Sequence, residues 1–188
     1  MATSIEGKRV AFLATDGVEE VEYTEPRKAV EAAGASAHLV SLEAGAVQGF
    51  NHLDKGDTFE TDAGLDDADP SRYDGLVLPG GVANPDRLRT DPRAVELVKA
   101  FFADERPVAV ICHGPWTLVE AGVLKGRTIT SWPSLRTDIR NAGGTWVDET
   151  VNVDGVLVSS RKPDDLPAFC DAMLEQFAAQ RSRTAPSN

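Results

Sequence analysis

This chain of 188 residues is poor in the residue types that mark several classes of protein. It has two cysteines, Cys112 and Cys170, too few for the disulfide framework of a small secreted protein. Its three histidines, His38, His52 and His113, match no common metal-ligand spacing, so no metal is expected. No Gly-x-Gly-x-x-Gly fingerprint follows the first predicted strand, so no dinucleotide cofactor is expected either.

Long apolar runs and an excess of positive charge are also missing. No run approaches the roughly 20 apolar residues that cross a bilayer, and residues 1–8 do not resemble a signal peptide. The formal net charge is -11, so nucleic acid and anionic membrane surfaces should repel the protein. We therefore expect a cytoplasmic protein that binds neither nucleic acid nor membrane.

Segments that suit strands alternate along the chain with segments that suit helices. Residues 43–69 are polar and turn-rich, which is typical of a small hairpin on the surface. This order predicts one α/β domain over residues 1–180, with helices on both faces of a mainly parallel sheet. A polar tail at 181–188 is expected to be disordered. Strands are predicted at 8–15, 37–42, 73–78, 107–111, 128–130 and 155–159, and helices at 26–33, 90–104, 116–121 and 166–177.

The most informative segment is 107–116, in which a short apolar strand ends directly at Cys112. The next three residues are His-Gly-Pro, and a predicted helix follows. A cysteine at such a strand-to-helix turn forms a nucleophile elbow, where helix amides face the sulfur and favour the thiolate. The alternative is an inert core thiol, which suits Cys170 on the apolar face of the last helix. We interpret Cys112 as a reactive thiol.

Gly80, Gly81 and His113 also follow predicted strands, and ligands bind at the carboxyl ends of parallel strands. An amide of Gly80 or Gly81 could act with the His113 amide as an oxyanion donor. The His113 ring could donate a proton or orient substrate, and a helix-capping histidine is the alternative. Because adjacent residues on a sharp turn point apart, this ring need not touch the Cys112 sulfur.

Three glutamates follow the first predicted strand, and they are expected to behave differently. Glu19 and Glu20 fit a solvated face, which is the usual place of a carboxylate run. Glu22 could instead point at the Cys112 sulfur and share a proton with it as general acid or base.

Several motifs together resemble the PfpI family of the ThiJ/PfpI superfamily, whose members include intracellular protease I and protein deglycases. The match extends from about Val10 to Phe177. The resemblance implies a flavodoxin-like three-layer sandwich, with Cys112 as nucleophile and Glu22 beside it. The motifs are Glu22 before Pro26, LPGG at 78–81, AVICHGP at 109–115, AGGTWVD at 142–148, VDG at 153–155 and SSRKPDDLP at 159–167.

The resemblance also implies a homodimer or higher oligomer, in which an acidic residue of a neighbouring subunit approaches His113. The matching residue here is Asp86, where many relatives carry the longer glutamate, and a surface turn residue is the alternative. Class I glutamine amidotransferases share the sandwich and the cysteine elbow. They also need a late His-x-Glu pair, and this chain has no histidine after His113.

Three functions are compatible with these residues. The first is a stress-response enzyme that acts hydrolytically on reactive carbonyl adducts of small molecules or proteins, like a deglycase or glyoxalase, through Cys112 and Glu22. The second is an intracellular cysteine peptidase that uses Cys112, His113 and Asp86. The third is a redox sensor or chaperone without turnover, in which Cys112 oxidises selectively.

Overall fold

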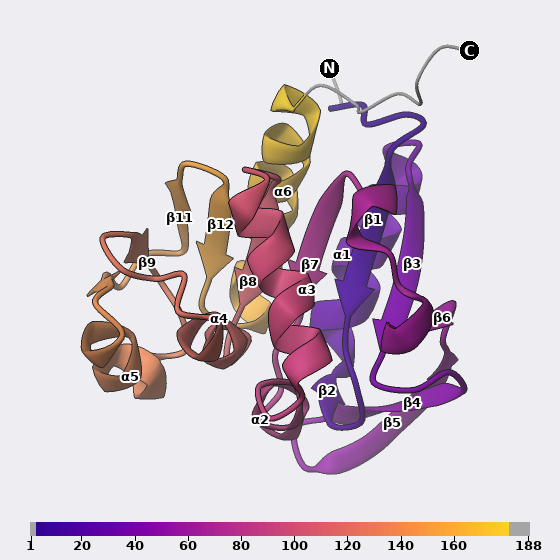
Figure 1. The fold of residues 1–188 in the computed structure, drawn as a ribbon, viewed down its shortest axis with the longest axis horizontal. Coiled ribbons are helices and arrows are strands. Elements are labelled where there is room, and N and C mark those ends of the chain that lie inside the picture. Colours follow the sequence, from indigo (N-terminus) through magenta and orange to yellow (C-terminus); the bar gives the residue numbers. More distant parts are fainter. Residues whose placement is uncertain (1–2, 181–188) are drawn as a thin grey trace.

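Seven strands form the central sheet, in the spatial order β11-β12-β8-β7-β1-β3-β6 (Figure 1). Neighbouring strands run parallel, except that β11 and β12 pair antiparallel. The mainly parallel sheet predicted from the sequence is therefore confirmed. The strands are β1 (Arg9–Leu13), β3 (Ser36–Ser41), β6 (Ala63–Gly64), β7 (Gly75–Leu78), β8 (Val108–Ile111), β11 (Val151–Asp154) and β12 (Leu157–Ser160).

The structure, a computed structural model, describes residues 3–180. The tail at 181–188, for which disorder is predicted, lies outside the described residues. No helix within 3–180 combines the length and the apolarity that crossing a bilayer needs.

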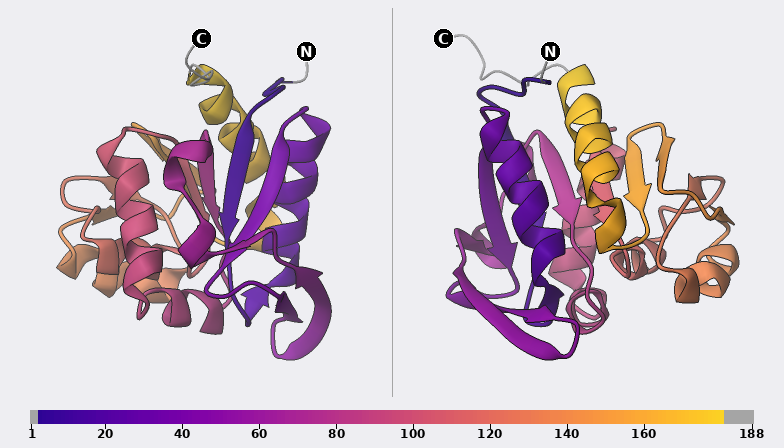
Figure 2. Two further views of the ribbon diagram at one scale, coloured as in Figure 1. Left: turned by 45° about the vertical axis from the view of Figure 1, so that its right-hand side comes forward. Right: turned by 180° about the vertical axis from the view of Figure 1, so that it is seen from behind.

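Helices cover both faces of the sheet, as predicted. α1 (Glu20–Ala32) and α6 (Leu166–Ala179) lie on one face, and α3 (Pro92–Ala103) and α4 (Pro115–Ala121) lie on the other (Figure 2). This arrangement is the flavodoxin-like three-layer sandwich. Two further helices, α2 (Ala83–Leu88) and α5 (Arg136–Asn141), are short and carry no clear apolar period.

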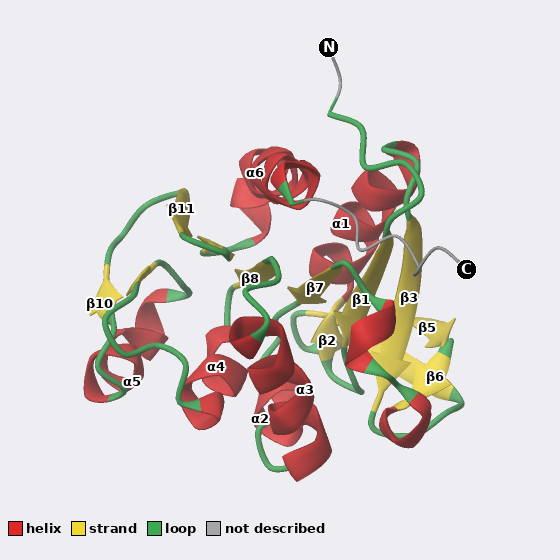
Figure 3. Cartoon of the chain, turned by 45° about the horizontal axis from the view of Figure 1, so that its top comes forward, coloured by secondary structure: helices red, strands yellow, loops and turns green. Residues whose placement is uncertain are grey.

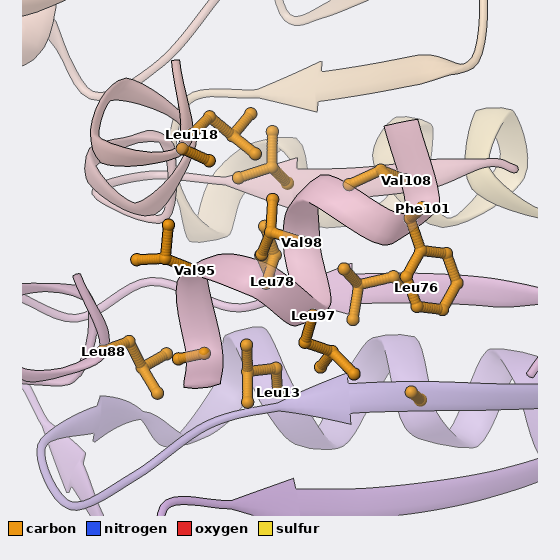
Figure 4. Packing of buried hydrophobic residues seen from close by; sticks show 14 of the residues in the cluster. Leu13, Leu76, Leu78, Leu88, Val95, Leu97, Val98, Phe101, Val108 and Leu118 are labelled. Atoms are coloured by element: carbon orange, nitrogen blue, oxygen red, sulfur yellow. The ribbon is translucent and has the colours of Figure 1, made fainter. Parts of the chain in front are cut away.

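Each face of the sheet has its own apolar core. On the α3 side, Val98 and Phe101 pack over Leu76 and Leu78 of β7, and all four side chains are buried (Figure 4). β8 is fully buried on both faces, which explains its unbroken apolar sequence. Burying one such side chain stabilises the fold by about 1.5–3 kcal/mol.

Local signals fix the ends of two helices as expected. The Asp91 side chain accepts the Arg93 N–H, and Pro92 occupies the first helical position of α3. Gly122 ends α4 in the left-handed conformation, with φ of 68°.

The first helix begins earlier than predicted. The prediction starts it at Pro26, but α1 begins at Glu20 and holds Pro26 in its interior. Glu22, Pro26 and Val30 lie four residues apart and are all buried, so they share one face of the helix. Burial of this face outweighs the backbone hydrogen bond that Pro26 cannot donate.

A second sheet lies at the carboxyl ends of β1 and β3, at the bottom of the view in Figure 1, and Figure 3 shows its strands β2 and β5 in yellow. It consists of β2 (Val18–Glu19) and a hairpin of β4 (Ala46–Asn51) and β5 (Asp54–Glu60). The hairpin confirms the prediction for residues 43–69. The remaining pair is β9 (Thr128–Ile129) with β10 (Thr145–Trp146), and single 3-10 turns lie at Leu65–Asp67, Pro70–Arg72, Pro133–Leu135 and Pro163–Asp165.

Candidate active site

Cys112 lies at a strained turn between β8 and α4. Its φ is 63°, in the left-handed region that residues with a Cβ rarely adopt. The turn is held from both sides, because the Cys112 N–H donates to the Ser160 carbonyl at 3.2 Å and the Cys112 carbonyl accepts the Trp132 N–H at 2.9 Å. The elbow predicted from the sequence is therefore present as a backbone feature.

Glu22 projects from α1 to the sulfur and is 0% exposed. Its Oε2 accepts the Gly80 N–H at 2.9 Å, and the carboxyl group faces the Cys112 thiol. Gly80 lies between the two side chains. A Cβ on Gly80 would overlap Glu22 Oε2 and lie 2.6 Å from Cys112 Cβ, so only glycine fits there.

The Glu22 carboxyl group is arranged to hold a proton. Burial, aided by the nearby Glu19 carboxylate, raises its pKa from 4.5 to about 8. Its second oxygen, Oε1, is buried with no hydrogen-bond partner among the described residues, which would be costly for a carboxylate oxygen. A protonated Glu22 instead carries a hydroxyl that can donate toward the sulfur.

Opposing influences act on the Cys112 thiol. Burial and the negative charge of Glu22 raise its pKa, whereas the amides of Gly81 and His113, which donate to the sulfur, lower it. The net direction is upward, opposite to the direction expected from helix amides alone, because Cys112 is only 6% exposed. The thiol therefore needs a base beside it.

The His113 ring lies beside the thiol. Its Nδ1 lies 3.1 Å from Cys112 Sγ, so the ring turns back onto the sulfur instead of pointing away from it as expected. The ring stacks on Trp132 at 5.7 Å between centroids and lies 5.3 Å from Trp116. Burial lowers the pKa of His113, so the imidazole is neutral and Nδ1 can accept a proton when Nε2, 3.5 Å from Ser134 Oγ, carries the hydrogen.

The backbone amides of the two glycines after β7 make different contacts. The Gly80 N–H is engaged by Glu22, whereas the Gly81 N–H points at the sulfur together with the His113 N–H. Gly81 has φ of 79°, and a Cβ there would overlap the Gly17 carbonyl. Of the two predicted glycine donors, Gly81 is the one whose amide faces the sulfur, and it also lies within reach of the Glu22 carboxyl group. The oxyanion role itself stays a prediction.

Asp86 lies on the exposed side of α2. Within the chain it pairs with Arg89, with Oδ1 3.2 Å from Nη2. Asp86 and His113 line the same pocket. The approach of Asp86 to His113 from a neighbouring subunit stays a prediction.

The expectation of a solvated face for Glu19 is wrong. Glu19 is buried, and both of its carboxylate oxygens accept the His52 N–H, at 3.1 and 3.3 Å. Glu20 is half-buried and accepts the Asp57 N–H at 2.6 Å. Both glutamates hold the β4–β5 hairpin, which passes over the start of α1.

A pocket of about 960 Å³ opens above Cys112. The hairpin residues of its wall are not among the residues predicted from the sequence, because the segment there is only polar and turn-rich. Within residues 3–180, no three His, Cys, Asp or Glu side chains are placed to hold a metal ion. The hairpin residues that line the pocket are Gln48, Phe50, His52, Leu53 and Lys55, and Val82, Trp132 and Pro163 add further apolar surface.

A flavodoxin-like sandwich with a cysteine at a strained elbow defines a known class of proteins. The DJ-1/PfpI family matches residues 8–176. The chain is 43% identical over 161 residues to Deglycase TK1284 of Thermococcus kodakarensis, covering 86% of this chain and 94% of that protein. It is 44% identical over 162 residues to a protein of Bacillus subtilis named "Putative cysteine protease YraA", with the same coverage.

Solved structures agree with this fold. Drosophila melanogaster DJ-1beta superposes with a TM-score of 0.83 at 26% identity, covering 92% of this chain and 91% of that chain. A ThiJ/PfpI domain protein from Brachyspira murdochii gives a TM-score of 0.85 at 23% identity, covering 94% and 99%. The chain belongs to the DJ-1/PfpI family.

Proposed function

We propose that this protein is a cysteine-dependent hydrolase of reactive carbonyl adducts, similar in activity to the relatives named deglycases. One observation carries the proposal: a fully buried Glu22 carboxyl group faces the Cys112 thiol, whose Sγ lies 3.1 Å from His113 Nδ1. A carbonyl adduct must move a proton between neighbouring carbons before it can be hydrolysed. A protonated acid next to the reacting sulfur supports this step.

The first step is addition of the sulfur to the carbonyl carbon. His113 Nδ1 accepts the thiol proton as the C–S bond forms, and the carbonyl oxygen takes a proton to give a hemithioacetal. The amides of Gly81 and His113 stabilise the oxygen while it carries negative charge. With a methylglyoxal adduct of a thiol or amine, the adducted group leaves with a proton and the same hemithioacetal results.

The second step converts the hemithioacetal into a thioester. Glu22, having given its proton to the carbonyl oxygen in the first step, takes the proton from the carbon bonded to sulfur and delivers it to the neighbouring ketone carbon, while the hydroxyl proton passes to the ketone oxygen. This is an internal redox change, in which one carbon is oxidised and the other reduced, so no external oxidant is required. Water then attacks the thioester, and lactate and the free Cys112 thiol are released.

The test is turnover of methylglyoxal, followed by the lactate produced. We expect Cys112→Ala to abolish turnover and Glu22→Gln to lower it by at least about a hundredfold, the usual contribution of a general acid or base. Cys170→Ala serves as the matched control, because Cys170 lies on α6 away from the pocket-lining residues. Turnover that survives Cys112→Ala would refute the proposal.

Peptidase activity is the second candidate, because the Cys112–His113 contact is also the dyad of a cysteine peptidase. Peptide hydrolysis by the Cys112–His113 dyad does not require Glu22. A peptidase would therefore tolerate Glu22→Gln, whereas the carbonyl hydrolase would not. Purified protein should be assayed with both substrate types and both variants.

A further inference from the structure

The β4–β5 hairpin forms one wall of the pocket and is fixed to the segment that leads into α1. Glu19 and Glu20 accept hairpin amides, and Asp16 Oδ1 accepts the Gln48 N–H at 2.8 Å. Phe59 of β5 packs edge-on against Tyr23 of α1, with centroids 4.9 Å apart. The wall is thus held in place before a substrate enters, which favours selective binding.

The charged side chains that line the pocket are nearly all engaged by partners. Glu19 accepts from His52, and Glu22 accepts from Gly80. The ion pairs Asp86–Arg89 and Asp16–Arg87 have N–O distances of 3.2 and 3.4 Å. Each of these side chains therefore has a partner within the chain.

Lys55 is the exception. It is exposed, lines the pocket from β5, and has no ion-pair partner in the part of the chain that the structure describes. The protein as a whole carries a charge of -11, which disfavours anionic ligands. At physiological salt, however, charges more than about 8 Å apart are largely screened, so the side chains that line the pocket set the local preference for charge.

The pocket is too large for a three-carbon dicarbonyl compound alone. Its volume of about 960 Å³ is at the upper end of the range for sites that hold drug-sized ligands. Cys112, in the buried part, takes the carbonyl carbon, and the remainder of an adduct must extend toward the mouth. The mouth carries the exposed apolar side chains of Leu53, Val82 and Trp132, together with the Lys55 ammonium group.

We propose that Lys55 is a specificity-determining residue that pairs with a carboxylate on the thiol or amine portion of the adduct. The preferred substrates are then carbonyl adducts of free amino acids or of short peptides, whose carboxylate lies a few bonds from the reacting carbon. The choice of substrate rests on the proposed function. The predicted attraction of an anion toward Cys112 does not depend on the proposed function.

The first experiment needs no turnover. Rates of Cys112 alkylation by anionic iodoacetate and by neutral iodoacetamide are measured in a Cys170→Ser background, and their ratio is compared between variants. Lys55→Ala should lower the iodoacetate-to-iodoacetamide ratio by about threefold, the size expected for an exposed ion pair. Lys55→Arg should preserve the ratio, and added salt should lower it in the wild type but not in Lys55→Ala.

Lys125→Ala is the matched control, because Lys125 is also exposed but lies outside the pocket lining. It should leave the ratio unchanged. An equal ratio in the wild type and Lys55→Ala, or an equal fall in Lys125→Ala, would overturn the inference. Circular dichroism of each variant checks that the fold is retained.

The second experiment compares methylglyoxal adducts of N-acetylcysteine and N-acetylcysteamine, which differ by one carboxylate. We expect a higher kcat/KM for the N-acetylcysteine adduct, and loss of this preference in Lys55→Ala but not in Lys55→Arg. Turnover of both adducts without preference overturns the inference and leaves the proposed function standing. If neither adduct is turned over, the proposed function fails, and the alkylation ratio alone decides the role of Lys55.

Discussion

At the scale of single residues, Glu22 couples the chemistry of the site to folding. The unfolded chain releases the Glu22 proton near pH 4.5, whereas the folded protein holds it up to about pH 8. Between these values the folded state binds more protons, so stability must fall as the pH rises. Below pH 4.5 both states are protonated and the effect disappears.

Glu22→Gln should therefore remove a pH-dependent loss of stability. From pH 4.5 to pH 8, the free energy of unfolding of the wild type should fall relative to the variant by on the order of 4 kcal/mol, since one pKa unit corresponds to about 1.4 kcal/mol. Urea unfolding at several pH values measures this difference. Glu25→Gln, at an exposed position of the same helix, is the control, and parallel curves for wild type and Glu22→Gln would contradict the prediction.

Gly80→Ala tests the close packing of the site. The added Cβ would overlap Glu22 Oε2 and crowd Cys112, so turnover should fall at least tenfold through displacement of the acid or the sulfur. Gly126→Ala is the control, because a Cβ there meets nothing within 4 Å although φ is 78°. The control should lose about 1 kcal/mol of stability through its backbone and keep its turnover. Equal turnover in the two variants would argue against the packing role of Gly80.

The sequence predicts Cys112 well because its signals are local: an apolar strand, a turn and a helix. The direction of the His113 ring could not be predicted, because it depends on packing against Trp132, which lies 19 positions further along the chain. Glu19 looked solvated for the same reason, since its partner His52 lies 33 positions away. Contacts between distant segments leave no trace in local composition.

At the scale of elements, the hairpin depends on Glu19. Glu19→Ala removes the acceptor of the His52 N–H, so amide hydrogen exchange near residues 51–54 should accelerate and KM should rise more than kcat falls. Glu19→Gln keeps an acceptor oxygen and should preserve the exchange rates. Because it removes a charge that raises the pKa of Glu22, it should shift the pH profile of alkylation toward lower pH. Unchanged exchange in Glu19→Ala would show that the hairpin is held by other contacts.

Helix prediction succeeds where a helix has clear local signals and fails where a short helix has none. α3 was predicted from its cap and proline at 90–92, α4 from the glycine that ends it, and α6 from its regular apolar face. α2 and α5 have six residues each, and α2 contains Pro85, so neither shows a period. The start of α1 was missed because burial against the sheet, and not local preference, extends it beyond Pro26.

At the scale of the whole molecule, the predicted oligomer can be tested through Asp86. If Asp86 of one subunit orients His113 of another, Asp86→Asn should lower turnover. Mixing Asp86→Asn subunits with Cys112→Ala subunits should then restore part of it, because some pairs combine one intact Cys112 with one intact Asp86. The measurement is turnover before and after subunit exchange. Absence of recovery in a mixed oligomer would place Asp86 outside the site.

The left-handed backbone of Cys112 has a consequence for the evolution of this fold. A residue with a Cβ in that conformation, like an unpaired buried carboxyl oxygen, destabilises the native state by about 1–3 kcal/mol. Selection for heat resistance alone would replace Cys112 by glycine and Glu22 by an apolar residue. The most thermostable sequence on this backbone would therefore lack both groups on which the proposed reaction depends, so durability and the proposed activity oppose each other.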